Sequence, residues 1–165
     1  MKKYRKNVAI VVFNKDRKIL VCERIGRHRT PAWQFPQGGI NENENVEAAA
    51  YRELFEETSI VSAKLIKILD EPIIYEYPND VRKSLKKHNN NIEYFGQEQQ
   101  WVLLYFYGED NEINLSTKEP EFKSYKWESA EFAVNNVVDF KKASYIKALN
   151  LIKPHILNYD VSLKF

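Results

Sequence analysis

The stretch that decides the expected fold is Gly38–Ile60, GGINENENVEAAAYRELFEETSI. Its two leading glycines allow the backbone to turn sharply and to approach another group closely. The residues from about Asn45 to Thr58 have the composition of a helix, and Asn41, Asn43 and Asn45 are all candidate caps for its start. The stretch therefore predicts a sharp turn followed by one helix that ends in a cluster of acidic residues.

Three carboxylates of this helix share one face. At about 100° per residue, Glu56 and Glu57 lie about 60° and 40° to either side of Glu53. The same sector holds apolar residues, namely Val46, Ala49 and Ala50. Carboxylates crowded on a half-apolar face repel one another, and a hard divalent cation such as Mg²⁺ or Mn²⁺ relieves that repulsion, whereas zinc would need histidine or cysteine. Arg52 precedes Glu56 by four residues and can orient it. The helix alone leaves two interpretations open: a metal site or a surface cluster of salt bridges.

The rest of the chain mixes strands and helices without regular alternation. We expect strands at 8–13, 19–23, 33–35, 63–69, 73–77, 101–107 and 125–127, with a turn at 14–18 that makes the first two a hairpin. The third of these strands is expected to be stopped by Pro36 and the Gly38-Gly39 pair. A helical region is expected near Ala130, and a last helix from about Asp139 carries Phe140, Ala143, Ile146, Leu149 and Ile152 at helical spacing. The polar, basic segment 25–32 reads as a loop, and the asparagine-rich segment 81–93 as a mobile excursion. The pattern predicts an α/β/α sandwich on a mixed sheet, with residues 1–165 as a single domain.

Composition bounds the class of protein. The chain has 165 residues, 44% hydrophobic and 29% charged, which is ordinary for a globular protein. Its one cysteine, Cys22, excludes an internal disulfide and is expected to be a packing residue. The apolar run 8–13 is too short for a signal peptide, and no apolar stretch reaches the length of a membrane helix. We therefore expect a cytoplasmic protein with no membrane partner.

Charge is unevenly distributed. Residues 1–29 hold ten Lys or Arg against two acidic residues, and residues 41–60 hold six glutamates against Arg52. A basic region followed by an acidic cluster is what a metal-assisted phosphate site requires. On charge counts alone, a solvated charged surface is the favoured alternative.

The spacing within the deciding stretch resembles the signature of the Nudix hydrolases. Gly38, five residues, Glu44, seven residues and then Arg52-Glu53-Leu54-Phe55-Glu56-Glu57 match Gly-x5-Glu-x7-Arg-Glu-Φ-x-Glu-Glu-x-Gly-Φ, where Φ is aliphatic. Ser59 departs from the pattern, which has a glycine there. Because that glycine follows the glutamates and would end the helix, we expect Ser59 to adjust the turn, leave catalysis intact and cost little stability.

Further segments resemble one branch of this family, the bacterial RNA 5′-pyrophosphohydrolases and the similar dinucleoside-polyphosphate hydrolases. They are Tyr4-Arg5-x-Asn7-Val8, Trp33–Ile40, Gly96-Gln97-x-Gln99-x-Trp101, Glu112–Leu115, Pro120-Glu121-Phe122 and Phe140–Lys142. The resemblance runs from Tyr4 to about Leu149 and is weakest between Asp70 and Tyr94.

The resemblance implies a role for individual residues. Glu53, Glu56 and Glu57 would bind Mg²⁺ or Mn²⁺ and, with Arg52, form the catalytic group, while Gly38 and Glu121 would add metal contacts. The implied substrate contacts are Arg5, Arg24, Gln37, Gln97, Phe140, which would stack on a base, Lys141, and one of Tyr75 and Tyr77, between which the pattern does not decide. Taken alone, Phe140 would more often be a core residue and Glu121 a loop acid. The histidines at 28, 88 and 155 lie in loop or terminal settings and are expected to have no role.

The reaction implied is attack of water on a phosphoanhydride, helped by metal ions and a carboxylate base. The first hypothesis is an enzyme that removes pyrophosphate from 5′-triphosphorylated RNA ends and so initiates RNA decay. Its basic first third and a stacking aromatic suit a single-stranded end. The close alternative is a dinucleoside polyphosphate (diadenosine tetraphosphate) hydrolase. More distant alternatives are a sugar-nucleotide pyrophosphatase and a non-catalytic nucleotide-sensing module. DNA is not expected as a partner, and protein partners stay open.

Overall fold

The computed structural model describes residues 1–26 and 32–165, so most of the loop expected at 25–32 lies outside the described residues. The elements in chain order are β1 (Tyr4–Phe13), β2 (Ile19–Arg24), β3 (Trp33–Gln34), β4 (Gln37–Gly39), α1 (Val46–Thr58), β5 (Ala63–Ile68), β6 (Ile73–Glu76), α2 (Asn79–His88), β7 (Gly96–Phe106), the 3-10 turn η1 (Asp110–Glu112), β8 (Phe122–Glu128), α3 (Ala130–Asn136) and α4 (Asp139–Asn158). Among the described residues the strands form one mixed sheet with the order β3-β2-β1-β7-β5, and β4, β6 and β8 pair with β1, β7 and β2.

The parallel pair β1 and β7 forms the centre of the sheet, with register from Tyr4 opposite Gly96 to Phe13 opposite Tyr105. Successive side chains of a strand point to opposite faces. In β1, Val8, Ile10 and Val12 belong to one buried cluster, and Ala9, Val11 and Phe13 to the other. Because both faces are covered, this segment is an unbroken apolar run.

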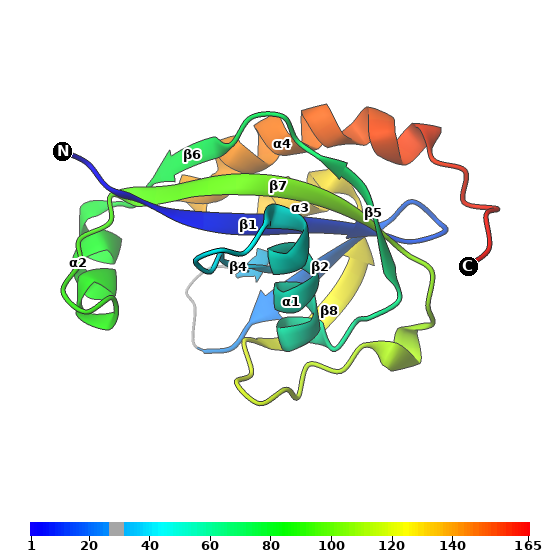
Figure 1. The fold of residues 1–165 in the computed structure, drawn as a ribbon, viewed down its shortest axis with the longest axis horizontal. Helices are drawn as coiled ribbons and strands as arrows, with labels where there is room; N and C mark the ends of the chain where they lie inside the picture. The colour runs from blue at the N-terminus through cyan, green and yellow to red at the C-terminus, as the bar shows by residue number, and fades with distance from the viewer. Residues whose placement is uncertain (27–31) are drawn as a thin grey trace.

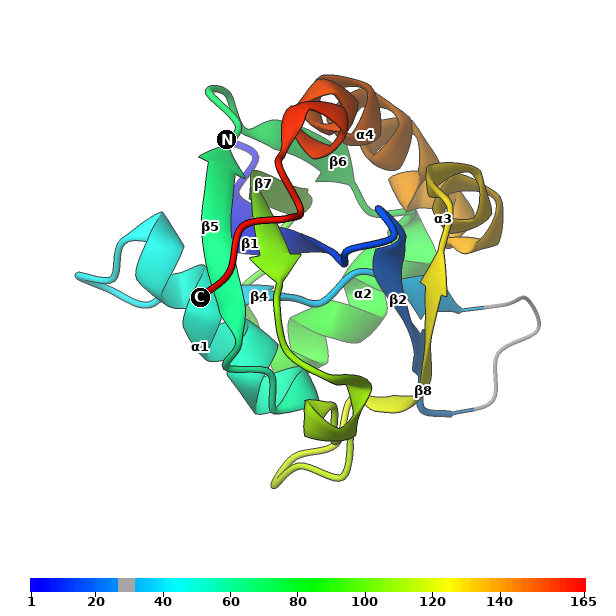
Figure 2. The same ribbon diagram turned by 90° about the vertical axis from the view of Figure 1, so that its right-hand side faces the viewer.

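Helices cover both faces of the sheet (Figures 1 and 2). On one face α1 contributes Ala49, Ala50 and Leu54 to a core cluster. On the other face α3 and α4 contribute Ala133, Tyr145 and Ile152, among others. The predicted α/β/α sandwich on a mixed sheet is confirmed.

The buried stripe of α4 differs from the predicted one. Ala143 and Ile146 are exposed, whereas Tyr145 and Ala148 are buried. The stripe begins with polar residues, Lys141 and Ser144, which are also buried. Hydrophobic spacing misses such a stripe because half of its first two turns is polar.

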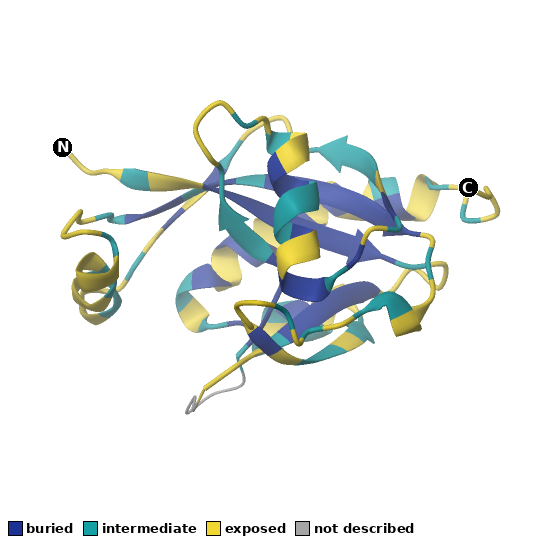
Figure 3. Ribbon diagram, turned by 60° about the horizontal axis from the view of Figure 1, so that its bottom comes forward, coloured by how far each residue is buried: buried dark blue, intermediate teal, exposed yellow. Residues whose placement is uncertain are grey.

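The prediction of a mobile, irregular segment at 81–93 is wrong for its first part, since 79–88 forms α2. No residue of α2 is buried, and the helix stands apart from the body of the protein (Figures 1 and 3). The Arg82 guanidinium lies over the Phe95 ring at 4.4 Å and its Nε is 3.4 Å from a Glu93 carboxylate oxygen. Val81 and Leu85 are the only apolar residues of this polar helix, too few to distinguish it from a loop by sequence, which is why the pattern missed it.

Two strands extend beyond their predicted bounds and place polar residues at the site. β1 begins at Tyr4 and β7 at Gly96, so Arg5 pairs with Gln97 and Asn7 with Gln99. β3 ends at Gln34, before Pro36, as expected, but the glycine pair at 38–39 lies in a further strand, β4, which pairs with β1 and was not predicted. Within the described residues, no helix has the length and apolar character to cross a membrane.

Candidate functional site

One cavity of about 590 Å³ lies where the sheet meets α1, α2 and the start of α4. The predicted site residues that line it are Arg5, Arg24, Gln37, Gly38, Glu53, Glu56, Glu57, Tyr75, Tyr77, Gln97, Glu121, Phe140 and Lys141. Arg52 is the one predicted site residue outside this lining. The structure therefore brings together side chains that are far apart in the sequence, the most distant being Arg5 and Lys141, 136 positions apart.

The acidic residues are placed by α1, which starts where the sequence predicts. The Asn45 side chain accepts a hydrogen bond from the Ala48 backbone N–H at 2.7 Å, which identifies the cap among three candidates. Along the helix, Glu57 is 7% exposed, whereas the Glu56 side chain is 55% exposed. The three carboxylates thus range from buried to open on the cavity wall.

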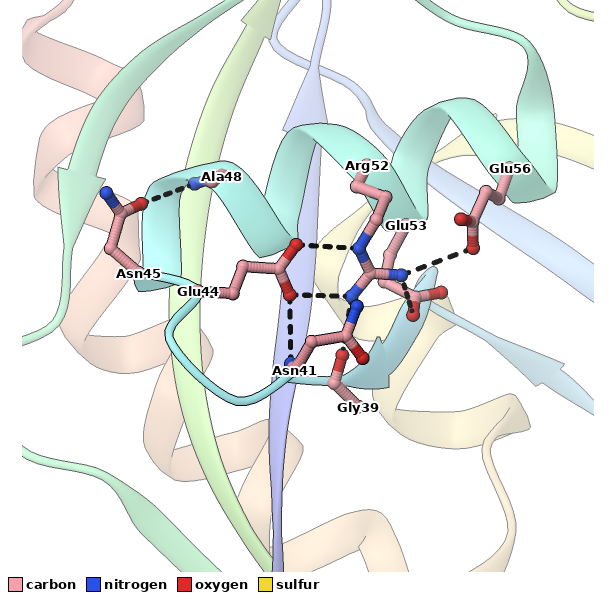
Figure 4. Close-up of polar contacts among 8 residues, drawn as sticks. All are labelled: Gly39, Asn41, Glu44, Asn45, Ala48, Arg52, Glu53 and Glu56. Atoms are coloured by element: carbon pink, nitrogen blue, oxygen red, sulfur yellow. Dashed lines mark hydrogen bonds and ion pairs between the residues drawn. The ribbon is translucent and has the colours of Figure 1, made fainter.

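Arg52 lies behind the acidic cluster and ties it to the preceding loop (Figure 4). Its Nε and Nη2 donate to the two oxygens of Glu44 at 2.7 and 2.8 Å, and Nη2 also donates to the Gly39 carbonyl at 2.8 Å. Its Nη1 donates to Glu53 at 2.8 Å and to Glu56 at 3.3 Å. This bidentate partner lowers the pKa of Glu44 to about 2. Arg52 is therefore a positioning residue for two of the carboxylates.

Glu57 is a buried carboxylate with an oxygen that lacks a partner. Its Oε2 atom has no hydrogen bond in the described structure. Burial, followed by the charges of Glu53 and Glu121, raises the pKa of Glu57 to about 9. Burial also raises the pKa of Glu53, although its hydrogen bond from Arg52 opposes that change. The unpartnered oxygen of Glu57 is therefore open to a further ligand.

These groups suit a hard divalent cation in donor chemistry. As the side chains lie, no three acidic, histidine or cysteine groups in residues 1–26 and 32–165 converge on a single metal position. Glu53 and Glu56 instead turn an oxygen each toward Arg52. The unpartnered oxygen of Glu57 and the all-oxygen donor set nevertheless fit Mg²⁺ or Mn²⁺ rather than zinc.

Gly38 packs directly against the acidic cluster. A Cβ atom built at this position would lie 1.9 Å from the Glu53 carboxylate carbon. The pairing of β4 with β1 sets this approach, with Gly38 opposite Val8. Only a residue without a side chain leaves room for the Glu53 carboxylate here.

A buried amide cluster borders the cavity through Asn7, Gln37 and Gln97, and two of its members, Asn7 and Gln99, were not predicted as site residues. The Gln99 Nε2 atom lies 2.9, 3.2 and 3.3 Å from side-chain oxygens of Asn7, Gln37 and Gln97. The Tyr75 hydroxyl donates to Gln97 at 2.7 Å. Gln97-x-Gln99 at strand spacing places both amides on one face, and this signal was available in the sequence.

Lys141 is a buried cation in the same cavity. It is 6% exposed, and its Nζ lies 3.5 Å from the side-chain oxygens of both Gln34 and Gln37. Burial, with a further contribution from Arg24, lowers the pKa of Lys141 to about 7. Its protonation is therefore balanced near neutral pH and will respond to any anion that enters.

Three aromatic rings form one wall. Phe140 lies with its ring centroid 5.8 Å from that of Tyr75 and 6.1 Å from that of Tyr77, and the two tyrosines are 5.7 Å apart. Both tyrosines line the cavity, so the structure places the two alternatives side by side. Phe140 is half-buried and is not part of either core cluster.

Helix α2 supplies a wall that sequence reasoning missed. Val81, Leu85, His88 and the following Asn89 line the cavity. The prediction of a loop setting for His88 is wrong, since it is the last residue of α2.

The remaining histidines and the cysteine lie elsewhere. His155 is on α4, away from this cavity, and His28 lies outside the described residues. Cys22 is buried, as expected.

Ser59 ends α1 in the left-handed conformation, with φ of 65°. Its N–H donates to the Phe55 carbonyl and its hydroxyl to the Asn114 carbonyl, both at 2.9 Å. The helix therefore ends at the position where the Nudix pattern has glycine, as expected.

Ser59→Ala keeps the strained backbone and loses the hydroxyl bond to Asn114. We expect the free energy of unfolding to fall by about 1 kcal/mol, with kcat unchanged. Urea unfolding monitored by circular dichroism, together with a turnover assay, measures both. A fall in kcat without loss of stability would contradict a purely structural role for Ser59.

Comparison with known proteins gives a consistent result. A model of the NUDIX domain matches residues 3–149. The chain is 45% identical over 154 residues to an RNA pyrophosphohydrolase of Pelagibacter ubique, covering 93% of this chain and 94% of the relative. It is 40% identical over 156 residues to the chloroplastic Nudix hydrolase 26 of Arabidopsis thaliana, covering 93% and 71%.

Solved structures share the fold at low sequence identity. A C. elegans Ap4A hydrolase in a binary complex aligns with TM-score 0.61 and 16% identity, covering 90% of this chain and 98% of that one. The E. coli dihydroneopterin triphosphate pyrophosphohydrolase aligns with TM-score 0.63 and 21% identity, covering 90% and 99%. At such identities the likeness concerns the fold alone.

Proposed function

The chain belongs to the NUDIX family, and from this membership we propose that it is a pyrophosphohydrolase that removes pyrophosphate from 5′-triphosphorylated RNA ends, the step that initiates RNA decay. The observation that carries the proposal is the cavity of about 590 Å³ described above. It holds an acidic cluster, the cations Arg5, Arg24 and Lys141, and an aromatic wall. A nucleoside 5′-polyphosphate needs all three: a hydrolytic centre, phosphate contacts and a platform for the base.

The names of several relatives support RNA as the substrate. Relatives from Pelagibacter ubique and Histophilus somni are named RNA pyrophosphohydrolase, at 45% and 38% identity over most of this chain. A cytoplasmic location is proposed with it, supported by the single, buried cysteine at position 22.

Nudix hydrolases generally use divalent metal ions, and we propose Mg²⁺ or Mn²⁺ for this protein. The residues proposed to hold it are Glu53, Glu56, Glu57, Glu121 and the Gly38 backbone. When bound, such an ion neutralises non-bridging phosphate oxygens and lowers the pKa of water. The unpartnered oxygen of Glu57 supports this assignment.

The protein's own groups supply positioning and charge in the proposed reaction. Arg5, Arg24 and Lys141 contact the phosphates, and Phe140 stacks on the first base with a tyrosine beside it. A carboxylate of the acidic cluster accepts the proton of the attacking water. Arg52 keeps Glu53 and Glu56 in place through the bonds of Figure 4. Phosphoryl transfer needs such positioning and charge stabilisation rather than a protein nucleophile.

The test is a side-by-side turnover assay with Mg²⁺ on a short 5′-triphosphorylated RNA and on diadenosine tetraphosphate. The proposal expects the larger kcat/KM on RNA, with pyrophosphate or successive phosphates released. A preference for the dinucleotide would instead make the protein a dinucleoside polyphosphate hydrolase. If the unmutated protein binds nucleotides and turns over neither substrate, it is a sensing module. Glu53→Gln is the control variant, because it removes a carboxylate and leaves the rest of the cavity. Loss of turnover with ligand binding retained in this variant supports an enzyme.

The low pKa of Lys141 predicts a pH dependence of substrate affinity. Below pH 7 the free enzyme already holds the proton, so affinity does not change through this group. Above pH 7 the free enzyme loses the proton and must regain it to bind a polyphosphate, so KM rises, by up to about tenfold per pH unit. Lys141→Arg stays charged at every pH tested and should flatten the rise. The measurement is the Michaelis constant of each protein from pH 6 to 9. Identical pH profiles for the unmutated protein and Lys141→Arg would refute the prediction.

A further inference from the structure

Helix α2 carries a concentrated positive charge beside the cavity. Between Asn79 and His88 there are four Lys or Arg and one acidic residue, Asp80, which gives a formal charge of +3 for these ten residues. The whole chain has a formal charge of +2. The helix therefore presents a local positive patch on a protein that is otherwise nearly balanced.

Most of this charge is not used inside the protein. Lys83, Lys86 and Lys87 are exposed. Among the described residues none of these three lysines forms an ion pair, whereas Arg82 is held by Glu93 and Phe95. Arg82 thus fixes the helix to the body, and the three lysines remain available to an external anion.

The opposite face of α2 belongs to the cavity wall. Val81, Leu85 and His88 recur at helical spacing on one face, and all three line the cavity with Phe140. The helix thus offers an apolar and imidazole surface toward the cavity, and the three lysines lie on its outer side, more than about 120° around the helix axis from that surface. Stacking surfaces next to cations are what a single-stranded nucleic acid requires.

We infer that α2 is the surface over which the RNA strand leaves the cavity, so that it binds the nucleotides that follow the 5′-terminal one. The bases nearest the cavity lie on Val81, Leu85 and His88, and the phosphates of the nucleotides that follow contact the three lysines on the outer side of the helix. This inference rests on the proposed function. RNA is favoured over an acidic protein surface because α2 connects the cavity, where the 5′ end is proposed to react, to three exposed lysines.

The test compares two RNA lengths in the triple variant Lys83→Gln, Lys86→Gln, Lys87→Gln. The unmutated protein is expected to have a larger kcat/KM on a 5′-triphosphorylated 12-nucleotide RNA than on a 5′-triphosphorylated RNA of only two nucleotides. In the variant, kcat/KM on the long RNA is expected to fall about tenfold at low salt. Its kcat/KM on the two-nucleotide RNA is expected to stay within about twofold of the unmutated value. Its dependence on salt should be weaker, by about two units in the log–log slope, because about 0.7 counterions are released per contact with a single strand.

A matched control removes the same charge elsewhere. The triple variant Lys15→Gln, Lys147→Gln, Lys153→Gln changes three exposed lysines outside the cavity and should keep the length dependence. Equal losses in the two triple variants, or an unchanged length dependence in the α2 variant, would overturn the inference and leave the α2 lysines to another class of partner. If the unmutated protein turns over diadenosine tetraphosphate but no RNA of either length, the proposed function itself has failed, which is a separate outcome.

Discussion

Glu57→Gln is expected to lower kcat by about a hundredfold or more and, in the absence of metal, to stabilise the fold. The loss follows if Glu57 holds a metal ion or accepts the proton of the attacking water, since each role is typically worth such a factor. The gain follows because Glu57 is 7% exposed, has an unpartnered oxygen and lies among other carboxylates. Replacing this carboxylate by an uncharged isostere should raise the free energy of unfolding by about 1 to 2 kcal/mol.

Steady-state kinetics and chemical unfolding in a metal-free buffer measure the two effects. Glu47→Gln, on an exposed position in the first turn of the same helix, is the matched control; it should leave kcat unchanged and lower the free energy of unfolding by no more than about 1 kcal/mol. Opposite signs for activity and stability are the distinctive result. Full turnover by Glu57→Gln would remove this residue from the catalytic group, and a loss of stability would mean that its carboxylate is well satisfied in the folded protein.

Gly38→Ala is expected to reduce kcat by about a hundredfold or more, whereas Gly39→Ala should change it only a few-fold. A Cβ at Gly38 would lie 1.9 Å from the Glu53 carboxylate carbon, so the carboxylate must move. A displacement of about 1 Å at a reacting centre costs on the order of a hundredfold in rate. At Gly39 the nearest atom is a terminal nitrogen of Arg5 at 3.0 Å, at the end of a flexible side chain.

The pair of adjacent glycines makes this a controlled comparison. Both variants are assayed for kcat, and their circular dichroism spectra and unfolding midpoints show whether each still folds. A Gly38→Ala protein that is folded and inactive supports the packing argument. Similar activity in the two variants would contradict it.

The chain's own pattern was sufficient for the acidic helix. The alternation of Ala49, Ala50 and Leu54 with glutamates at fixed spacing predicted α1 to within one residue at its start. It also predicted that carboxylates and apolar residues share a face, because both follow from helical geometry alone. The N-terminal hairpin was predicted for a similar reason, since Asn14–Lys18 interrupts two short apolar runs.

Features that depend on tertiary contacts were not predicted. Helix α2 has only two apolar residues, Val81 and Leu85, too few to reveal it, and β4 is a strand only because β1 is available to pair with Gly38. Gln99 gains its partners from Asn7, 92 positions earlier. The burial of Lys141, and with it the pKa near neutrality, follows from how α4 packs on the sheet. None of these can be read from local sequence.

The long parallel ladder between β1 and β7 has a consequence for how the protein is made. The ribosome completes β1 at Phe13, 83 residues before β7 begins at Gly96, and until then one edge of β1 has no partner strand. Contacts between such distant segments form slowly, because a large loop must close before they are made. Arg5 and Gln97 meet only at that step, so a nascent chain shorter than β7 carries an exposed apolar strand and no assembled cavity.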